Sequence, residues 1–170
     1  DGEVADFFAT AAKTFGGLDG VHLNFADFSG AHPDNDLLTL PMNVRDRQAA
    51  VNERGFVICA RNSLPYLIER GGGAIVFTTS GAAISPYAGG YAYGMAKAAI
   101  HALMRHIAYR YGPQRIRSNA VAPGYVPHQG LMETAAPGIA ERAMQRNAYK
   151  GRPVHENDIA ALCALLMSDD

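Results

Sequence analysis

Hydrophobic residues recur every three to four positions in four long segments of the chain. This spacing is typical of helices that bury one apolar face. The segments are residues 3–15, 43–69, 92–111 and 158–168. Glycines closely follow the first three, as expected where helices end. Pro65 lies inside the second segment and predicts a bend or a new turn there. The pattern therefore predicts four helices.

Three shorter apolar, β-prone runs lie between these helices, at residues 21–25, 74–79 and 116–122. The middle run is apolar or β-branched throughout, which is typical of a strand buried on both faces. Strands that alternate with helices of ten or more residues need crossover connections, and these favour parallel pairing. We expect an α/β fold with an open, doubly wound parallel sheet, in which residues 1–170 form a single domain.

Composition and charge narrow the classes of partner. The 48% hydrophobic content supports one sizeable core, and the formal net charge of −1 gives no electrostatic reason to expect nucleic acid or an anionic membrane. The apolar runs are shorter than a membrane span. Cys59 and Cys163 lie in apolar predicted helices, where reduced thiols are usual, so we expect a cytoplasmic protein that binds small molecules.

Tyr93 and Lys97 are four residues apart at the start of a predicted helix, so their side chains share one face. A neighbouring ammonium stabilises a phenolate, which would let Tyr93 exchange a proton near neutral pH. Ser80 follows the middle strand and could donate a second hydrogen bond to a substrate oxygen. By themselves, the pair could be an exposed helix pair and Ser80 a turn cap. Together they indicate proton transfer at the carboxyl ends of the strands, where open α/β sheets bind ligands.

Four motifs around these residues resemble the short-chain dehydrogenase/reductase family: IVFTTSG, YGMAK, IRSNAVAPG and AVNERGF. In that family the catalytic serine lies thirteen positions before the tyrosine, as Ser80 lies before Tyr93. The resemblance implies a Rossmann-like fold and hydride transfer between a small-molecule carbonyl or alcohol and NAD or NADP. It also implies a homo-oligomer, a dimer or tetramer, that associates through the 43–69 and 92–111 helices.

The resemblance also implies a role for each matching residue. Ser80 would polarise the substrate oxygen, Tyr93 would exchange the proton and Lys97 would hold the nicotinamide ribose. Asn52 would anchor a proton-relay water. The expected cofactor-binding residues are Asn24, Ala26, Tyr93, Lys97, Pro123, Gly124 and Val126.

The chain also departs from the family pattern. The family's Asn-Asn-Ala-Gly segment aligns with residues 24–27, where Asp27 replaces glycine. A carboxylate there adds bulk and negative charge near an anionic cofactor, and weakens binding unless it points away. His128 stands where the family often has threonine. His32, Tyr87 and Tyr125 are further candidates for the substrate cleft.

A glycine-rich phosphate loop, which opens a helix after a strand, is not found in these 170 residues. We expect an internal portion of the family's domain, incomplete at both ends. Two alternatives stay open. One is a degenerate, non-catalytic member that acts as a binding or oligomerisation partner, and the other is a different reaction, such as dehydration or epimerisation, on the same scaffold.

Overall fold

The computed structural model describes residues 1–29, 34–85, 90–127, 138, 141, 144–145 and 151–169. These residues form a three-stranded sheet in the order β1 (Gly20–Leu23), β2 (Gly73–Thr78), β3 (Ile116–Val121). Both pairings are parallel, with Val21 opposite Ile75 and Ile75 opposite Ser118. The predicted parallel sheet is confirmed.

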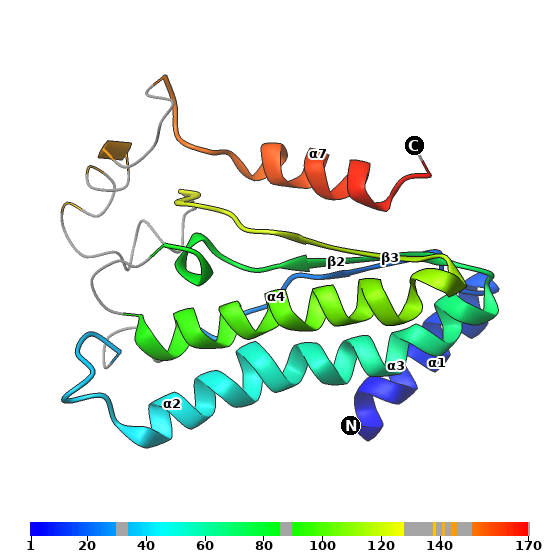
Figure 1. Ribbon diagram of the computed structural model, residues 1–170, viewed down its shortest axis with the longest axis horizontal. Helices are drawn as coiled ribbons and strands as arrows, with labels where there is room; N and C mark the ends of the chain where they lie inside the picture. Colours follow the sequence, from blue (N-terminus) through cyan, green and yellow to red (C-terminus); the bar gives the residue numbers. More distant parts are fainter. Residues whose placement is uncertain are drawn as a thin grey trace.

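Helices cover both faces of this sheet, as a doubly wound fold requires (Figure 1). They are α1 (Gly2–Phe15), α2 (Met42–Ala49), α3 (Gly55–Glu69), α4 (Tyr91–Tyr111) and α7 (Glu156–Met167). Helices α1 to α4 lie on one face of the sheet and α7 lies on the other. Short 3-10 turns, Gly81–Ala83 and Gly112–Gln114, follow β2 and precede β3.

The predicted elements all appear, with small differences at their ends. The strand expected at residues 21–25 ends at Leu23, because the chain there turns away from β2. The expected 43–69 helix is continuous but contains a π-helical turn, Ala50–Arg54, between α2 and α3. Pro65 lies inside α3 and does not end it.

The core has two parts because the side chains of β2 alternate between the two faces of the sheet. Ile75 and Phe77 join a large cluster under α1, α3 and α4, whereas Val76 joins Val121 and Cys163 of α7. Residues 74–77 of β2 are all fully buried. This burial confirms the expectation that the middle strand is covered on both faces.

The loops that leave β2 and β3 run together beyond the sheet. The N–H of Thr79 donates to the Val121 carbonyl at 2.8 Å, and the N–H of Gly81 donates to the Pro123 carbonyl at 2.7 Å. Figure 1 shows the turn after β2 and the start of α4 at this same end of the sheet. The carboxyl edge is therefore where side chains from several elements meet.

Two further expectations concern the whole chain. Of the helices in the described ranges, none has the length and apolar character needed to cross a membrane. Cys59 and Cys163 are both free thiols.

Candidate active site

Lys97 of α4 holds the centre of the carboxyl edge. Its side chain is 1% exposed, and Nζ donates to the carbonyl of Phe25 at 3.2 Å and to that of Thr78 at 3.1 Å. Phe25 follows β1 and Thr78 is the last residue of β2, so one ammonium ties two strand ends to α4. Nζ lies 4.5 Å from the centroid of the Phe56 ring and 5.9 Å from that of Tyr93.

Burial of the Lys97 ammonium is unfavourable because it removes a charged group from water. Among the described residues it forms no ion pair, and burial lowers the pKa of the Lys97 ammonium to about 8. Two of its three N–H groups are used by backbone carbonyls. The third can therefore serve a hydroxyl or a developing anion.

Tyr93 lies one helical turn before Lys97, in the first turn of α4. Its side chain is half-buried, and its ring centroid lies 5.5 Å from that of Phe28, an exposed side chain in the segment after β1. The pair at positions 93 and 97 is thus not the exposed helix pair that the spacing alone also allows, because Lys97 is buried.

Ser80 begins the 3-10 turn after β2, with an extended backbone. Its Oγ accepts from the N–H of Ala82 at 3.2 Å, a bond that uses a lone pair and leaves the hydroxyl proton for another acceptor. The turn packs closely on α4, since a Cβ at Gly94 would lie 3.2 Å from the Ala82 carbonyl oxygen. Gly94 therefore lets the turn of Ser80 approach the helical turn that carries Tyr93.

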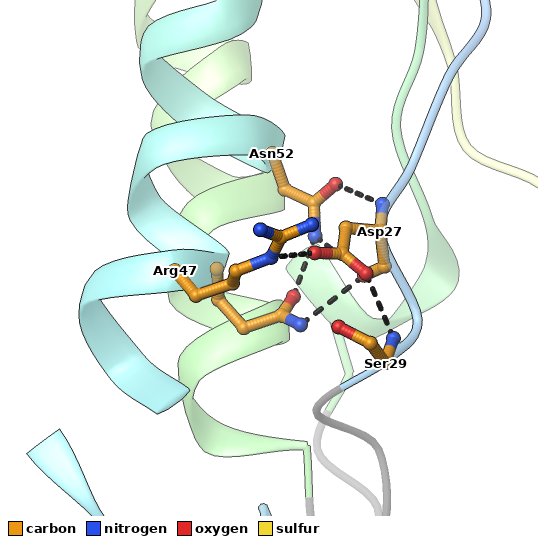
Figure 2. Close-up of polar contacts among 5 residues, drawn as sticks. Asp27, Ser29, Arg47 and Asn52 are labelled. Atoms are coloured by element: carbon orange, nitrogen blue, oxygen red, sulfur yellow. Dashed lines mark hydrogen bonds and ion pairs between the residues drawn. The ribbon is translucent and has the colours of Figure 1, made fainter. Parts of the chain in front are cut away.

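Asn52 lies in the π-helical turn and is completely buried. Its Oδ1 accepts from the N–H of Asp27 at 2.8 Å, while Nδ2 donates to the Asp27 carbonyl at 3.0 Å and to Gln48 Oε1 at 2.5 Å (Figure 2). Both N–H groups of the amide are used, and its oxygen faces no solvent. A relay water at Asn52 would therefore be held by the main chain of Asn52 rather than by its side chain. The π-helical turn changes the hydrogen bonding of the main chain at this point.

Asp27 turns its carboxylate toward α2. Its two oxygens accept from the N–H of Ser29 at 2.8 Å and from Arg47 Nε at 2.5 Å (Figure 2). The hydrogen bonds from Ser29, followed by the interaction with Arg47, lower the pKa of Asp27 to about 2. Sequence reasoning missed Arg47 and Gln48, although Gln48 precedes Asn52 by four residues, the spacing of neighbours on one helix face.

The other predicted cofactor-binding residues lie in the segments that leave β1 and β3. Asn24 and Gly124 are exposed, whereas Ala26, Pro123 and Val126 are half-buried. Two hydrogen bonds join these segments to the site: Lys97 Nζ donates to the Phe25 carbonyl, and the N–H of Gly81 donates to the Pro123 carbonyl. His32, Tyr87 and His128 lie outside the described residues.

Residues 1–170, the whole chain, match the family model described as Enoyl-(Acyl carrier protein) reductase. A short-chain type dehydrogenase/reductase of Bradyrhizobium diazoefficiens is 36% identical over 167 residues, which cover 98% of this chain and 59% of that protein. The chain belongs to the short-chain dehydrogenase/reductase family. It spans about three fifths of the length of this relative.

Solved structures of short-chain dehydrogenases share the fold. One from Burkholderia xenovorans superposes with a TM-score of 0.87 at 24% identity, and covers 98% of this chain and 62% of its own. A 7α-hydroxysteroid dehydrogenase, solved with NADH and 7-oxo glycochenodeoxycholic acid, gives 0.86 at 26% identity, with coverage of 98% and 63%. The predicted Rossmann-like fold is therefore confirmed.

One departure of this short-chain dehydrogenase/reductase now has a structural explanation. Asp27 replaces the family's glycine, and its negative charge is matched by Arg47, which comes from α2. The side chain of Asp27 is only 11% exposed. The carboxylate is thus directed toward the Arg47 cation of α2, which offsets its negative charge.

Proposed function

We propose that the protein is an NAD- or NADP-dependent oxidoreductase that interconverts a small-molecule carbonyl and its alcohol. The observation that carries this proposal is the buried Lys97 ammonium one turn from Tyr93, with one N–H left for a ligand. The family membership supports the reaction class. The related steroid dehydrogenase solved with NADH and an oxo ligand supports both the cofactor and the substrate class.

The residues present fit a nicotinamide cofactor at the carboxyl edge. The free N–H of Lys97 requires an acceptor, and a ribose hydroxyl supplies one. The segments that carry Asn24, Ala26, Pro123, Gly124 and Val126 are held at that position by the hydrogen bonds that the Phe25 and Pro123 carbonyls accept. When bound, the nicotinamide would supply or accept the hydride.

The proton chemistry belongs to three side chains. Tyr93 would donate its hydroxyl proton to the oxygen of the reduced carbonyl, and would take a proton from an alcohol in the reverse direction. Lys97 would favour the phenolate form of Tyr93 through its positive charge. Ser80 would donate its remaining hydroxyl proton to the same substrate oxygen, which stabilises developing negative charge.

The test is a nicotinamide absorbance assay of the full-length protein with a panel of ketones and alcohols. We expect Tyr93→Phe to lower kcat by at least about 100-fold, as general acid–base groups typically contribute. Tyr109→Phe is the matched control, because Tyr109 lies on the same helix and is 90% exposed. Equal turnover by Tyr93→Phe and the wild type would exclude this mechanism.

The alternatives from the sequence are separated by two further measurements. A degenerate, non-catalytic member would show no binding of NADH or NADPH by calorimetry, together with a stable complex with another protein. A dehydratase or epimerase would form product without a change in nicotinamide absorbance. The pairing of Asp27 with Arg47 weakens the first alternative, because an unpaired carboxylate in place of the family's glycine would be a reason to expect poor cofactor binding.

The proposal also covers the oligomeric state of the protein. We propose a homo-oligomer that forms through the 43–69 helix and α4, which carry the exposed apolar side chains of Val57 and Met95. Sedimentation as a monomer at high concentration would contradict it. The single domain and the cytoplasmic location stay predictions.

A further inference from the structure

The start of α4 lacks a side-chain cap of its own. Its N-cap residue is Gly90, which has no side chain to accept from the first N–H groups of the helix. These groups are normally satisfied by a nearby Ser, Thr, Asp or Asn. The turn concerned is the one that carries Tyr93, so its order matters for the proposed proton transfer.

Asp34, far away in the sequence, supplies the missing acceptors. Its Oδ1 accepts from the N–H of Ala92 and its Oδ2 from the N–H of Tyr93, both at 3.1 Å. Its main-chain carbonyl accepts from the N–H of Gly90 at 2.5 Å. One residue, in the segment between β1 and α2, thus binds three N–H groups at the start of α4.

The environment of Asp34 makes this arrangement specific. Asp34 is 1% exposed, and a carboxylate is rarely buried so completely unless hydrogen bonds or charges compensate it. The amino end of a helix is an electrostatically favourable place for an anion. The carboxylate is therefore held by α4 and, in turn, fixes the first turn of α4.

We propose that Asp34 is a positioning residue that fixes Tyr93 relative to Ser80 and Lys97. This inference rests on the proposed function of Tyr93. Lys97 is one turn deeper in the helix and has its own anchors, the carbonyls of Phe25 and Thr78. Loss of the Asp34 carboxylate therefore loosens the first turn and displaces Tyr93, while the lysine stays in place.

The position of a proton donor affects kcat more than it affects cofactor binding. A displacement of about 1 Å at a reacting group can lower a rate by about 100-fold. The anchors of Lys97 do not involve Asp34, so the KM for the nicotinamide cofactor should change little. This separation of kcat from KM distinguishes a positioning role from general loss of folding.

The experiment compares Asp34→Ala and Asp34→Asn in the full-length protein. We expect Asp34→Ala to lower kcat by at least about 10-fold, with the KM for NADH or NADPH within about threefold of the wild type. Asp34→Asn keeps one acceptor oxygen and should recover part of the loss. Asp36→Ala is the control in the same segment, because Asp36 is exposed and its side chain accepts from the nearby N–H of Leu38 rather than from α4.

A second measurement needs no activity at all. Hydrogen exchange of the Ala92 and Tyr93 amides should accelerate in Asp34→Ala, while that of the Ile107 amide, near the other end of α4, stays as in the wild type. Ile107→Val, a core change far from the cap, serves as the control for lowered stability. Should Asp34→Ala not fold, Asp34→Asn carries both measurements.

Two results would overturn the inference. One is a wild-type kcat in Asp34→Ala. The other is unchanged exchange of the Ala92 and Tyr93 amides. A parallel assay of Tyr93→Phe separates this failure from failure of the proposed function, since full activity of that variant refutes the role of Tyr93 whatever Asp34 does.

Discussion

Replacement of Lys97 by methionine tests the electrostatics of the site directly. The side chains have similar length, and the surroundings of Lys97 include the ring of Phe56, so methionine can fill the space. The change removes a buried ammonium and leaves the carbonyls of Phe25 and Thr78 without their donor. The first effect depends on pH, and the second does not.

The magnitude follows from the pKa of Lys97, which burial lowers from 10.5 to about 8. Between these values the unfolded chain holds a proton that the folded chain has released, so the free energy of unfolding rises with pH. At about 1.4 kcal/mol for each pH unit, the difference is roughly 3 kcal/mol over the window. Below pH 8 both states are protonated, and burial of the charge carries its full cost.

The assay is urea unfolding of the wild type and Lys97→Met at pH values from 7.5 to 10.5. We expect the free energy of unfolding of the wild type to rise by about 3 kcal/mol relative to that of the variant as the pH increases over this range. Lys13→Met, a change at an exposed lysine of α1, should show no such slope. A constant difference between wild type and Lys97→Met would refute the reasoning that this ammonium is desolvated.

Three other changes test the frame of the site. Asn52→Ala should lower the free energy of unfolding, measured in urea, by about 3 kcal/mol, because it leaves buried partners unpaired. Asn62→Ala loses one bond within α3 and should lower it by about 1 kcal/mol, so equal losses would contradict this prediction. Gly94→Ala should lower kcat about 10-fold in the absorbance assay with little loss of stability, because the new Cβ pushes the turn after β2 away. Gly112→Ala should leave kcat unchanged, because a Cβ at Gly112 meets no atom within 4 Å. Asp27→Asn should be less stable than the wild type above pH 3.8, and this difference should vanish as the pH falls through about 2. The reason is that the ion pair stabilises the fold only while the carboxylate is charged. A difference in stability that does not change with pH, followed by circular dichroism, would argue against the ion pair.

The elements of the fold follow from local patterns. The helical period of residues 3–15 and the apolar run of residues 74–79 each correspond to an observed element because burial of an apolar face dominates local structure. The spacing of Tyr93 and Lys97 fixed their shared helix face for the same geometric reason. Parallel pairing also followed, since long crossovers allow little else.

The partners of the site residues come instead from tertiary structure. The anchoring of Lys97, the pairing of Asp27 with Arg47 and the cap that Asp34 places on α4 join residues between 19 and 72 positions apart. No local period encodes such contacts, because they depend on how loops leave neighbouring strands.

The sequence by itself therefore determined the order of elements, the family resemblance and the identity of the candidate groups. Only the tertiary structure decided their environment. Desolvation and the direction of a carboxylate depend on what surrounds a side chain in space. These surroundings make Lys97 a buried cation beside Tyr93, and they make Asp27 one half of an ion pair rather than an uncompensated negative charge.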